Sequence, residues 1–260
     1  MKILRCPLYV HDLAESSLTG REKRVIRWQK VSPYLMSKNH LYLLRHGENP
    51  ANLSKQFSNR QVDFPLTEKG VIQAQQTADY LSRQNIRDIY SSPLRRAAQT
   101  ATIIADRLGL DVEVNESFRE IDVGALEGRP ATAAAWALHN QIINAWYDGA
   151  HETAFPKGEN YDALWARYYG GLLAAISGRS DEQILVVGHG GIQTVILKDL
   201  CPQLDVTWLR TTHWDNCAFA EIELVQLDND RLEGSLLAWN QHAHLQGRAA
   251  DLVPGVPGYE

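Results

Sequence analysis

The chain has 260 residues, of which 44% are hydrophobic and 22% charged, a composition typical of globular proteins. A chain of this length can bury a core that needs neither disulfides nor a structural metal. Its three cysteines, Cys6, Cys201 and Cys217, form no C-x-x-C pair and are interpreted as free thiols of a reducing compartment. No apolar run reaches the roughly 18 residues of a membrane span. Residues 1–10 make a poor signal peptide, so we expect a cytoplasmic protein without a membrane partner.

Charge is unevenly distributed along the chain. The net charge is −5, yet residues 1–38 carry eight Lys/Arg and three Asp/Glu, which leaves the remainder strongly acidic. An acidic body does not favour nucleic acid as a partner. We interpret residues 1–38 as an N-terminal extension, a solvated tail rather than a contact for an anionic surface, and residues 39–260 as one domain. Because Met36 leads into the first apolar run, we hypothesise that translation starts there.

Strands and helices alternate from residue 41 onward. Short apolar or alternating runs predict strands at 41–44, 86–91, 112–114 and 184–187, and a terminal hairpin of 219–225 with 232–239. Helices are expected at 67–81, at 93–108 and through 195–200. Thr67 is the expected N-cap of the first, Pro93 suits the first turn of the second, and Gly109 ends it. This alternation predicts an α/β fold, a three-layer sandwich with a mostly parallel central sheet.

A helical stretch without strands lies between Gly128 and Asp181, and includes 131–146 and 161–176. We interpret residues 129–180, approximately, as a helical cap insertion over one end of the sheet. It holds Trp136, Trp146 and Trp165, which are expected mostly to pack, with one of them as a candidate for lining a substrate pocket.

Four polar segments follow predicted strands or begin helices, where ligands collect in open α/β sheets. They are 45–49, 91–100, 118–124 with Glu127-Gly128 behind it, and 187–191. Together they contain two arginines and two histidines suited to a phosphoryl group, because arginine binds phosphate with a bidentate fork and imidazole is a good nucleophile toward phosphorus. Attack by His46 would split a difficult hydrolysis into two easier steps. A carboxylic acid is still needed to protonate the departing alkoxide.

The segment Leu44–Asn49 resembles the R-H-G-E signature of the histidine phosphatase superfamily, in the branch with cofactor-dependent phosphoglycerate mutases and fructose-2,6-bisphosphatases. The resemblance extends over residues 40–245. It includes Asn52, Leu66–Gly70, Ser92-Pro93-Leu94, Arg96-Ala97, Gln99-Thr100, Glu120, Gly124, Glu127-Gly128, Gly158-Glu159 and His189-Gly190.

The resemblance implies a role for each matched residue. His46 is phosphorylated, and the phosphoryl oxygens are held by Arg45, Arg96 and His189. Glu120 is the proton donor and later the base, although Glu116, Asp122 and Glu127 are carboxylates close by. Asn52 either contacts phosphate or substrate, or caps a loop. Arg95 ranks below Arg96, and Glu48 is expected to support the site rather than donate a proton. The family requires no metal, and we expect no cofactor.

Departures from the family pattern bear on the reaction. The mutases carry Glu-Arg-His-Tyr-Gly around the acid, whereas this chain has Glu120–Gly124 followed by Glu127-Gly128, which is similar to the phosphatase members. Asn59 replaces a glycine, and Asn160 replaces the serine of a Gly-Glu-Ser motif. The sequence therefore predicts hydrolysis of a small phosphate monoester through phospho-His46. The alternatives are a phosphoglycerate mutase-type phosphotransferase and, ranked low, a non-catalytic phospho-ligand module. The pair His242 and His244 lacks a third metal ligand, and an oligomer is left open.

Overall fold

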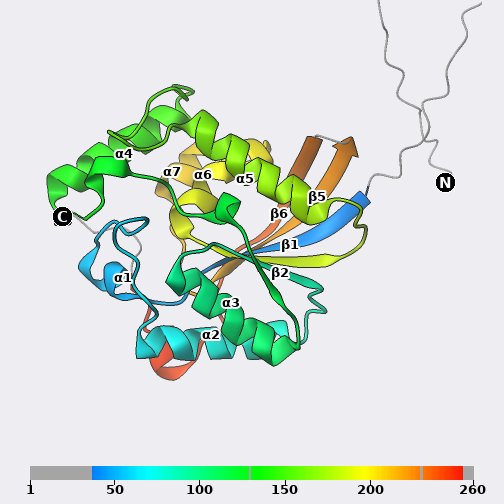
Figure 1. Ribbon diagram of the computed structural model, residues 1–260. Coiled ribbons are helices and arrows are strands. Elements are labelled where there is room, and N and C mark those ends of the chain that lie inside the picture. Colours follow the sequence, from blue (N-terminus) through cyan, green and yellow to red (C-terminus); the bar gives the residue numbers. More distant parts are fainter. Residues whose placement is uncertain (1–36, 129, 229–230, 254–260) are drawn as a thin grey trace, which may run out of the picture. The chain divides into compact units, whose positions relative to one another are not determined.

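The computed structural model describes residues 37–128, 130–228 and 231–253, and the expectations for residues 1–36 lie outside them. One six-stranded sheet is formed by the described residues, in the order β3-β2-β4-β1-β5-β6 (Figure 1). Its strands are β1 (Ser37–Arg45), β2 (Asp88–Ser91), β3 (Val112–Val114), β4 (Gln183–Gly188), β5 (Phe219–Asp228) and β6 (Arg231–Gln241). The strand positions predicted from the sequence, including the terminal hairpin, are confirmed to within a few residues.

The sheet is mixed. The pairs β1–β4, β2–β4 and β2–β3 are parallel, whereas β1–β5 and β5–β6 are antiparallel. The α/β class is confirmed, but the expectation of a mostly parallel sheet is not, because the hairpin joins the sheet beside β1 and runs against it. The three-layer description stays a prediction.

The helices are α1 (Pro50–Ser54), α2 (Glu68–Leu81), α3 (Arg95–Leu108), α4 (Ala133–Tyr147), α5 (Tyr161–Ile176), α6 (Gly190–Leu200) and α7 (Val206–Thr211). Thr67 caps α2 by accepting a hydrogen bond from Gly70 N, and Gly109 ends α3 in the left-handed conformation, both as predicted. Helix α3 begins at Arg95, after Pro93 rather than on it. The short helices α1 and α7 had no periodic signal in the sequence, because neither is two turns long. Among the described residues, no helix is long and apolar enough to cross a membrane.

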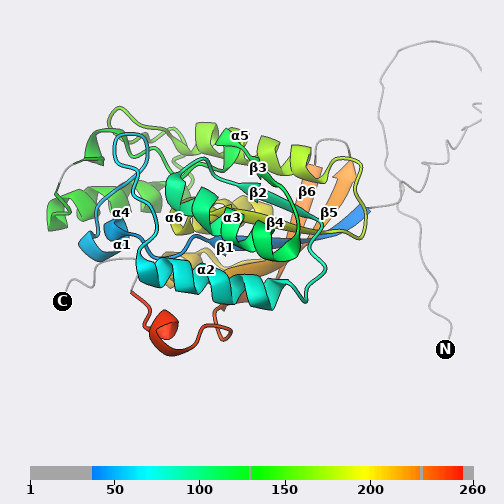
Figure 2. The ribbon, with the colours of Figure 1, turned by 60° about the horizontal axis from the view of Figure 1, so that its bottom comes forward.

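Alternate side chains of β1 enter two different hydrophobic clusters. Leu41 and Leu43 pack in the cluster that contains residues of α5 and α6, and Tyr42 and Leu44 pack in the cluster that contains residues of α2 and α3. Figure 2 shows α2 and α3 lying over one face of the strands. Burial on both faces explains the continuous apolar run that predicted this strand.

Because β1, β2 and β4 are parallel, their carboxyl ends meet at one edge of the sheet. His46 follows β1, Ser92 follows β2 and His189 follows β4. The order of the strands therefore brings together three of the four polar segments identified in the sequence.

Candidate active site

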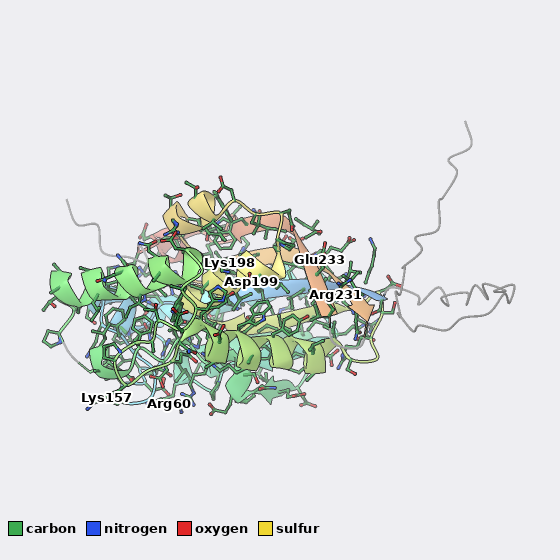
Figure 3. All side chains as sticks on the ribbon, turned by 90° about the horizontal axis from the view of Figure 1, so that it is seen from above. Arg60, Lys157, Lys198, Asp199, Arg231 and Glu233 are labelled. Carbon is green, nitrogen blue, oxygen red and sulfur yellow. The ribbon has the colours of Figure 1, made fainter. Side chains whose placement is uncertain are left out.

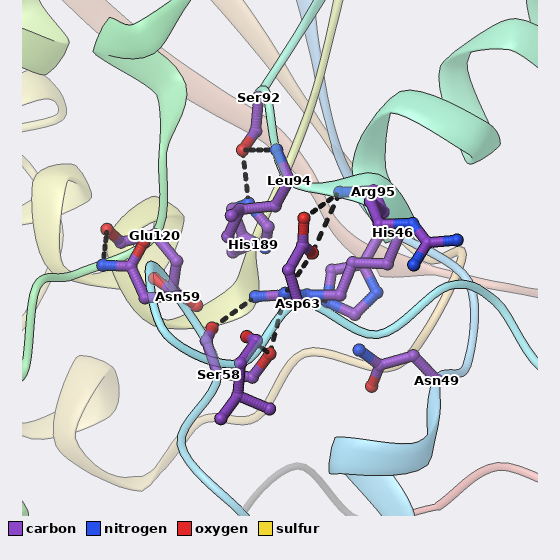
Figure 4. Close-up of polar contacts among 12 residues, drawn as sticks. His46, Asn49, Ser58, Asn59, Asp63, Ser92, Leu94, Arg95, Glu120 and His189 are labelled. Carbon is purple, nitrogen blue, oxygen red and sulfur yellow. Dashed lines mark hydrogen bonds and ion pairs between the residues drawn. The ribbon is translucent and has the colours of Figure 1, made fainter. Parts of the chain in front are cut away.

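A cavity of about 360 Å³ opens at this edge of the sheet. Five of the six residues expected to form the site line it, and they are Arg45, His46, Asn52, Arg96 and Glu120. The sixth, His189, is completely buried behind His46, with the two ring centroids 5.2 Å apart. The structure therefore brings all six into one cluster. Figure 4 shows His46, Glu120 and His189 of this cluster.

The loop that carries His46 is held by close contact with the two helices beneath it. Gly47 N donates to Thr100 Oγ1 of α3 over 3.1 Å. A Cβ added to Gly47 would lie 2.6 Å from the carbonyl oxygen of Gly70, which belongs to α2. Gly47 and Gly70 belong to two separate sequence motifs, and both are explained by the close contact between their two backbone segments.

The hydrogen bonds of His46 define which ring nitrogen is free to react. Nδ1 lies 2.7 Å from the carbonyl oxygen of Gly47, which can only accept, so Nδ1 carries the proton. Nε2 then holds the lone pair and accepts a hydrogen bond from Nε of Arg96 over 3.0 Å. Burial, Arg96 and Arg45 lower the pKa of His46 well below its usual value, which keeps the ring neutral. A neutral imidazole with its lone pair on a known atom has the form that a nucleophile requires.

Arg45 and Arg96 are buried, yet each keeps N–H donors available. Arg96 donates to Ser58 Oγ and to the Ser58 carbonyl oxygen besides His46, and Arg45 donates from Nη1 to the carbonyl oxygen of Trp214. A guanidinium has five N–H groups, so both have donors left for an anion. Burial lowers the pKa of Arg96 to about 10, which leaves it charged at neutral pH. Two buried cations beside His46 make the cavity a site for an anionic group.

Arg95 has a different environment, although it adjoins Arg96. Its side chain is exposed and does not line the cavity. Its backbone N–H donates to both carboxylate oxygens of Asp63, over 3.0 and 3.1 Å. The lower rank given to Arg95 agrees with this position.

His189 is held by the segment that follows β2. Its Nε2 lies 2.7 Å from Ser92 Oγ, and its Nδ1 has no hydrogen-bond partner. Burial and the neighbouring Arg96 lower the pKa of His189 well below its usual value. A buried polar atom without a partner is costly, so Nδ1 of His189 is an unsatisfied group at the site.

Glu120 extends from an irregular segment to the N-terminus of α6. Its Oε1 accepts from Ile192 N over 2.8 Å and its Oε2 accepts from Gly191 N over 3.2 Å. A Cβ at Gly191 would lie 2.9 Å from Oε1, so a larger residue there would displace the Glu120 carboxyl group. The contact accounts for Gly191, the second of the two glycines after His189.

The other carboxylates near Glu120 do not line the cavity. Glu116 pairs with Arg119, and Asp122 pairs with Arg60, which lies at the rim of the molecule (Figure 3). A single oxygen of Glu127 accepts hydrogen bonds from three backbone N–H groups, those of residues 59, 61 and 62, over 2.5 to 3.0 Å.

Glu48 also lies outside the cavity lining. It accepts from Thr67 Oγ1 over 2.9 Å and pairs with Lys69 Nζ at 2.5 Å. Both partners come from the Leu66–Gly70 motif, so Glu48 joins the loop of His46 to the start of α2. Its position agrees with the supporting role expected from the sequence.

Asn52 caps a helix, which is one of the two alternatives left open by the sequence, and it also lines the cavity. Its contact with phosphate or substrate stays a prediction. Asn49 and Asn52 form a reciprocal capping box at the start of α1. Asn52 Oδ1 also accepts from Asn216 Nδ2 over 3.0 Å, and the same Nδ2 donates to the carbonyl oxygen of His46. Sequence reasoning missed Asn216, because it lies in a turn before β5 without a motif or period to mark it.

Two further expectations concern aromatic residues and histidines outside this cluster. Of the three tryptophans in the expected cap, Trp136 lines the cavity, and Trp146 and Trp165 do not. His244 Nε2 lies 2.9 Å from Thr77 Oγ1, and its ring packs on Phe219. Within the described ranges, no group of three His, Cys, Asp or Glu side chains could hold a metal ion.

Comparison with known proteins places this geometry in a family. A protein of Yersinia pestis named probable phosphoglycerate mutase GpmB is 32% identical over 186 residues, 70% of this chain and 84% of that protein. A solved structure titled mycobacterial hydrolase 2 is similar with a TM-score of 0.67 and 26% identity, over 81% of this chain and 94% of that one.

Mycobacterial glucosyl-3-phosphoglycerate phosphatase in complex with inorganic phosphate shares the fold at a TM-score of 0.65 and 24% identity, over 80% of this chain and 99% of that one. The family model of the histidine phosphatase superfamily (branch 1) matches residues 41–240. The chain belongs to the histidine phosphatase superfamily, branch 1.

Proposed function

We propose that this protein hydrolyses a phosphate monoester through a covalent phosphohistidine on Nε2 of His46. The observation that carries the proposal is the hydrogen bond from Arg96 Nε to that nitrogen, inside a cavity that Arg45 also lines. This hydrogen bond orients the neutral imidazole so that the lone pair of Nε2 faces the place where the two buried arginines would hold a phosphoryl group.

In the first step, Nε2 attacks phosphorus, the P–N bond forms and the bond from phosphorus to the ester oxygen breaks. The Nε–H group of Arg96 now donates its hydrogen bond to a phosphoryl oxygen instead of to His46, and the remaining N–H donors of Arg45 bind a second phosphoryl oxygen. Glu120 donates its proton to the departing alkoxide, which leaves as the alcohol. Such positioning and charge stabilisation account for most of the catalysis of phosphoryl transfer.

In the second step, Glu120 accepts a proton from water while the water oxygen attacks phosphorus. The P–N bond breaks, inorganic phosphate forms and His46 regains its lone pair. The buried His189 ring, 5.2 Å from that of His46, would hold the phosphoryl oxygens together with the arginines. No metal or other cofactor takes part in this sequence of steps.

A phosphoglycerate mutase-type transfer is the second candidate, favoured by the 32% identity with the Yersinia protein that carries that name. Hydrolysis is preferred because the residues around the acid, Glu120–Gly124 with Glu127-Gly128 behind them, resemble the phosphatase members. The substrate is expected to be a small phosphorylated molecule. The cytoplasmic location and the oligomeric state stay predictions.

The test measures single-turnover phosphorylation and steady-state hydrolysis of p-nitrophenyl phosphate. We expect the wild type to form an acid-labile, base-stable phosphoryl group and His46→Asn to form none and to lose turnover. The surface variant His151→Asn is the control. Retained turnover in His46→Asn would contradict the nucleophile. With 3-phosphoglycerate as a second substrate, isomerised phosphoglycerate in place of inorganic phosphate as the main product would favour the mutase.

A further inference from the structure

The segment that carries Glu120 has little regular structure of its own. It runs between the short 3-10 helices Glu116–Phe118 and Gly124–Leu126 and contains no strand. Backbone groups in such a segment need partners from elsewhere in the fold. Those partners fix the main chain of Glu120, whose carboxylate is in turn held by Gly191 N and Ile192 N.

Arg167 of α5 supplies three of these partners. Its Nη1 donates to the carbonyl oxygens of Ser117 and Arg119, over 2.9 and 2.7 Å, and its Nη2 donates to that of Glu120 over 3.2 Å. Three carbonyl groups within four residues are thus bound by one guanidinium. The position of the Glu120 main chain therefore depends on a side chain of helix α5.

Glu159 completes the arrangement from the other side. It accepts from Arg167 at both carboxylate oxygens, over 2.9 Å from Nε and 2.7 Å from Nη2. Its Oε1 also accepts from Asp122 N over 2.8 Å, and Glu159 N donates to the carbonyl oxygen of Asp122 over 3.0 Å. Arg167 and Glu159 therefore hold residues 117 to 122 on both sides of Glu120.

Arg167 could either bind the phosphoryl group directly or act only through the segment that carries Glu120, and its hydrogen bonds decide between these two roles. A guanidinium has five N–H donors, and Arg167 makes five hydrogen bonds, three to carbonyl groups and two to Glu159. No donor remains for a phosphoryl oxygen, in contrast to Arg45 and Arg96, and Arg167 does not line the cavity. It can affect the reaction only through the segment that it binds.

We propose that Arg167, fixed by Glu159, is the positioning residue that places the carboxyl group of Glu120 for proton transfer to the leaving oxygen. The inference rests on the proposed function, because it assigns Glu120 the role of general acid. A small displacement of a reacting group is enough to slow a reaction substantially, and loss of Arg167 would remove a donor from three carbonyl groups at once, of which that of Glu120 would keep only the long bond from Asn59.

The test uses two substrates that differ in their need for an acid. The p-nitrophenolate ion leaves without a proton, whereas the alkoxide of β-glycerol phosphate does not. We expect Glu120→Gln to lower the ratio of kcat/KM for β-glycerol phosphate to that for p-nitrophenyl phosphate, by roughly 100-fold if general acid catalysis has its usual size. Arg167→Ala should lower this ratio by at least about tenfold, and Arg167→Lys less.

A double variant separates positioning from any other effect. If Arg167 acts through Glu120, Arg167→Ala in the Glu120→Gln background should not lower the ratio further. Arg179→Ala is the matched control: Arg179 follows α5, its side chain is 26% exposed against 24% for Arg167, and it pairs with Asp88 and Glu182. It should lower the melting temperature and leave the ratio unchanged.

The outcomes are distinct. Equal losses on both substrates in Arg167→Ala, or a further fall of the ratio in the double variant, would overturn the inference while leaving Glu120 as the acid. An unchanged ratio in Glu120→Gln would overturn both assignments. If Arg167→Ala does not fold, Arg167→Lys and Glu159→Gln replace it, and an unchanged ratio in both would be equally decisive.

Discussion

Arg96 and His46 are joined by a hydrogen bond that the proposed reaction must break. Arg96 Nε donates to His46 Nε2 over 3.0 Å, so the donor occupies the lone pair that would attack phosphorus in the proposed mechanism. An arriving phosphoryl oxygen would take over this donor, and binding of the substrate would then free Nε2.

Replacement of Arg96 by lysine tests this exchange. A lysine keeps the charge but cannot donate from three nitrogens to His46 and both Ser58 oxygens, as Arg96 does. We expect Arg96→Lys to lower kcat for p-nitrophenyl phosphate on the order of 100-fold, as for other lost donors at a developing charge. Arg95→Lys is the control, since its side chain is exposed, and an equal loss in that variant would contradict the assignment.

Adjacent glycines of α5 should respond in opposite ways to alanine. A Cβ at Gly170 meets nothing within 4 Å, so Gly170→Ala should raise the free energy of unfolding by about 0.5–1 kcal/mol through helix propensity. A Cβ at Gly171 would lie 2.6 Å from Ser117 Cβ, so Gly171→Ala should lower it by about 1–3 kcal/mol. Urea unfolding of both variants measures the difference, and equal stabilities would show that Ser117 moves freely.

Two partly buried histidines, His139 and His244, should make the stability of the fold sensitive to acid. Burial lowers the pKa of His139 to about 4, so between pH 6.5 and 4 the unfolded chain binds a proton at this residue that the folded chain does not. The free energy of unfolding therefore falls as pH decreases through this range. His139→Gln should reduce the slope by up to about 1.4 kcal/mol per pH unit in urea titrations.

His244→Gln provides a second measurement of the same effect, because burial also lowers the pKa of His244 to about 4. Each variant should make stability less dependent on pH than in the wild type. A slope steeper than that of the wild type in either variant would contradict the neutral form of the buried ring.

Removal of the Glu127 side chain should loosen the segment that holds Asn59 and Ser58. One oxygen of Glu127 accepts from three backbone N–H groups of residues 59–62, and bonds to a charged acceptor contribute about 1.5–3 kcal/mol each. We expect Glu127→Ala to lower the free energy of unfolding by roughly 3 kcal/mol and to raise KM, since Ser58 binds Arg96. Glu116→Ala, which loses only an exposed pair with Arg119, is the control for thermal melting.

Local sequence signals predicted the parts of this fold that local interactions determine. Thr67 and Gly109 mark helix ends because capping depends on neighbouring backbone groups. The convergence of the four segments was predicted because the carboxyl ends of parallel strands meet, which brings His46 and His189 together from separate segments.

The remainder depends on tertiary placement. Arg167 lies on a helix that the sequence predicted only as part of the cap insertion, and its partners Arg119 and Glu120 are 48 and 47 residues away. The antiparallel pairing of β5 with β1 has no counterpart in the period of either strand, because alternation indicates burial and not direction. Such contacts cannot be predicted from local sequence patterns and are identified only from the three-dimensional structure.

The position of β1 at the centre of the sheet has a consequence for synthesis of the protein. Its two partner strands, β4 and β5, lie far along the chain, and Asn216, which binds the carbonyl oxygen of His46, follows it by 170 residues. Pairings so distant in sequence form late and slowly. A ribosome therefore releases His46 long before β4, β5 and Asn216 are synthesised, and His46 gains its buried environment only when folding of the whole domain is nearly complete.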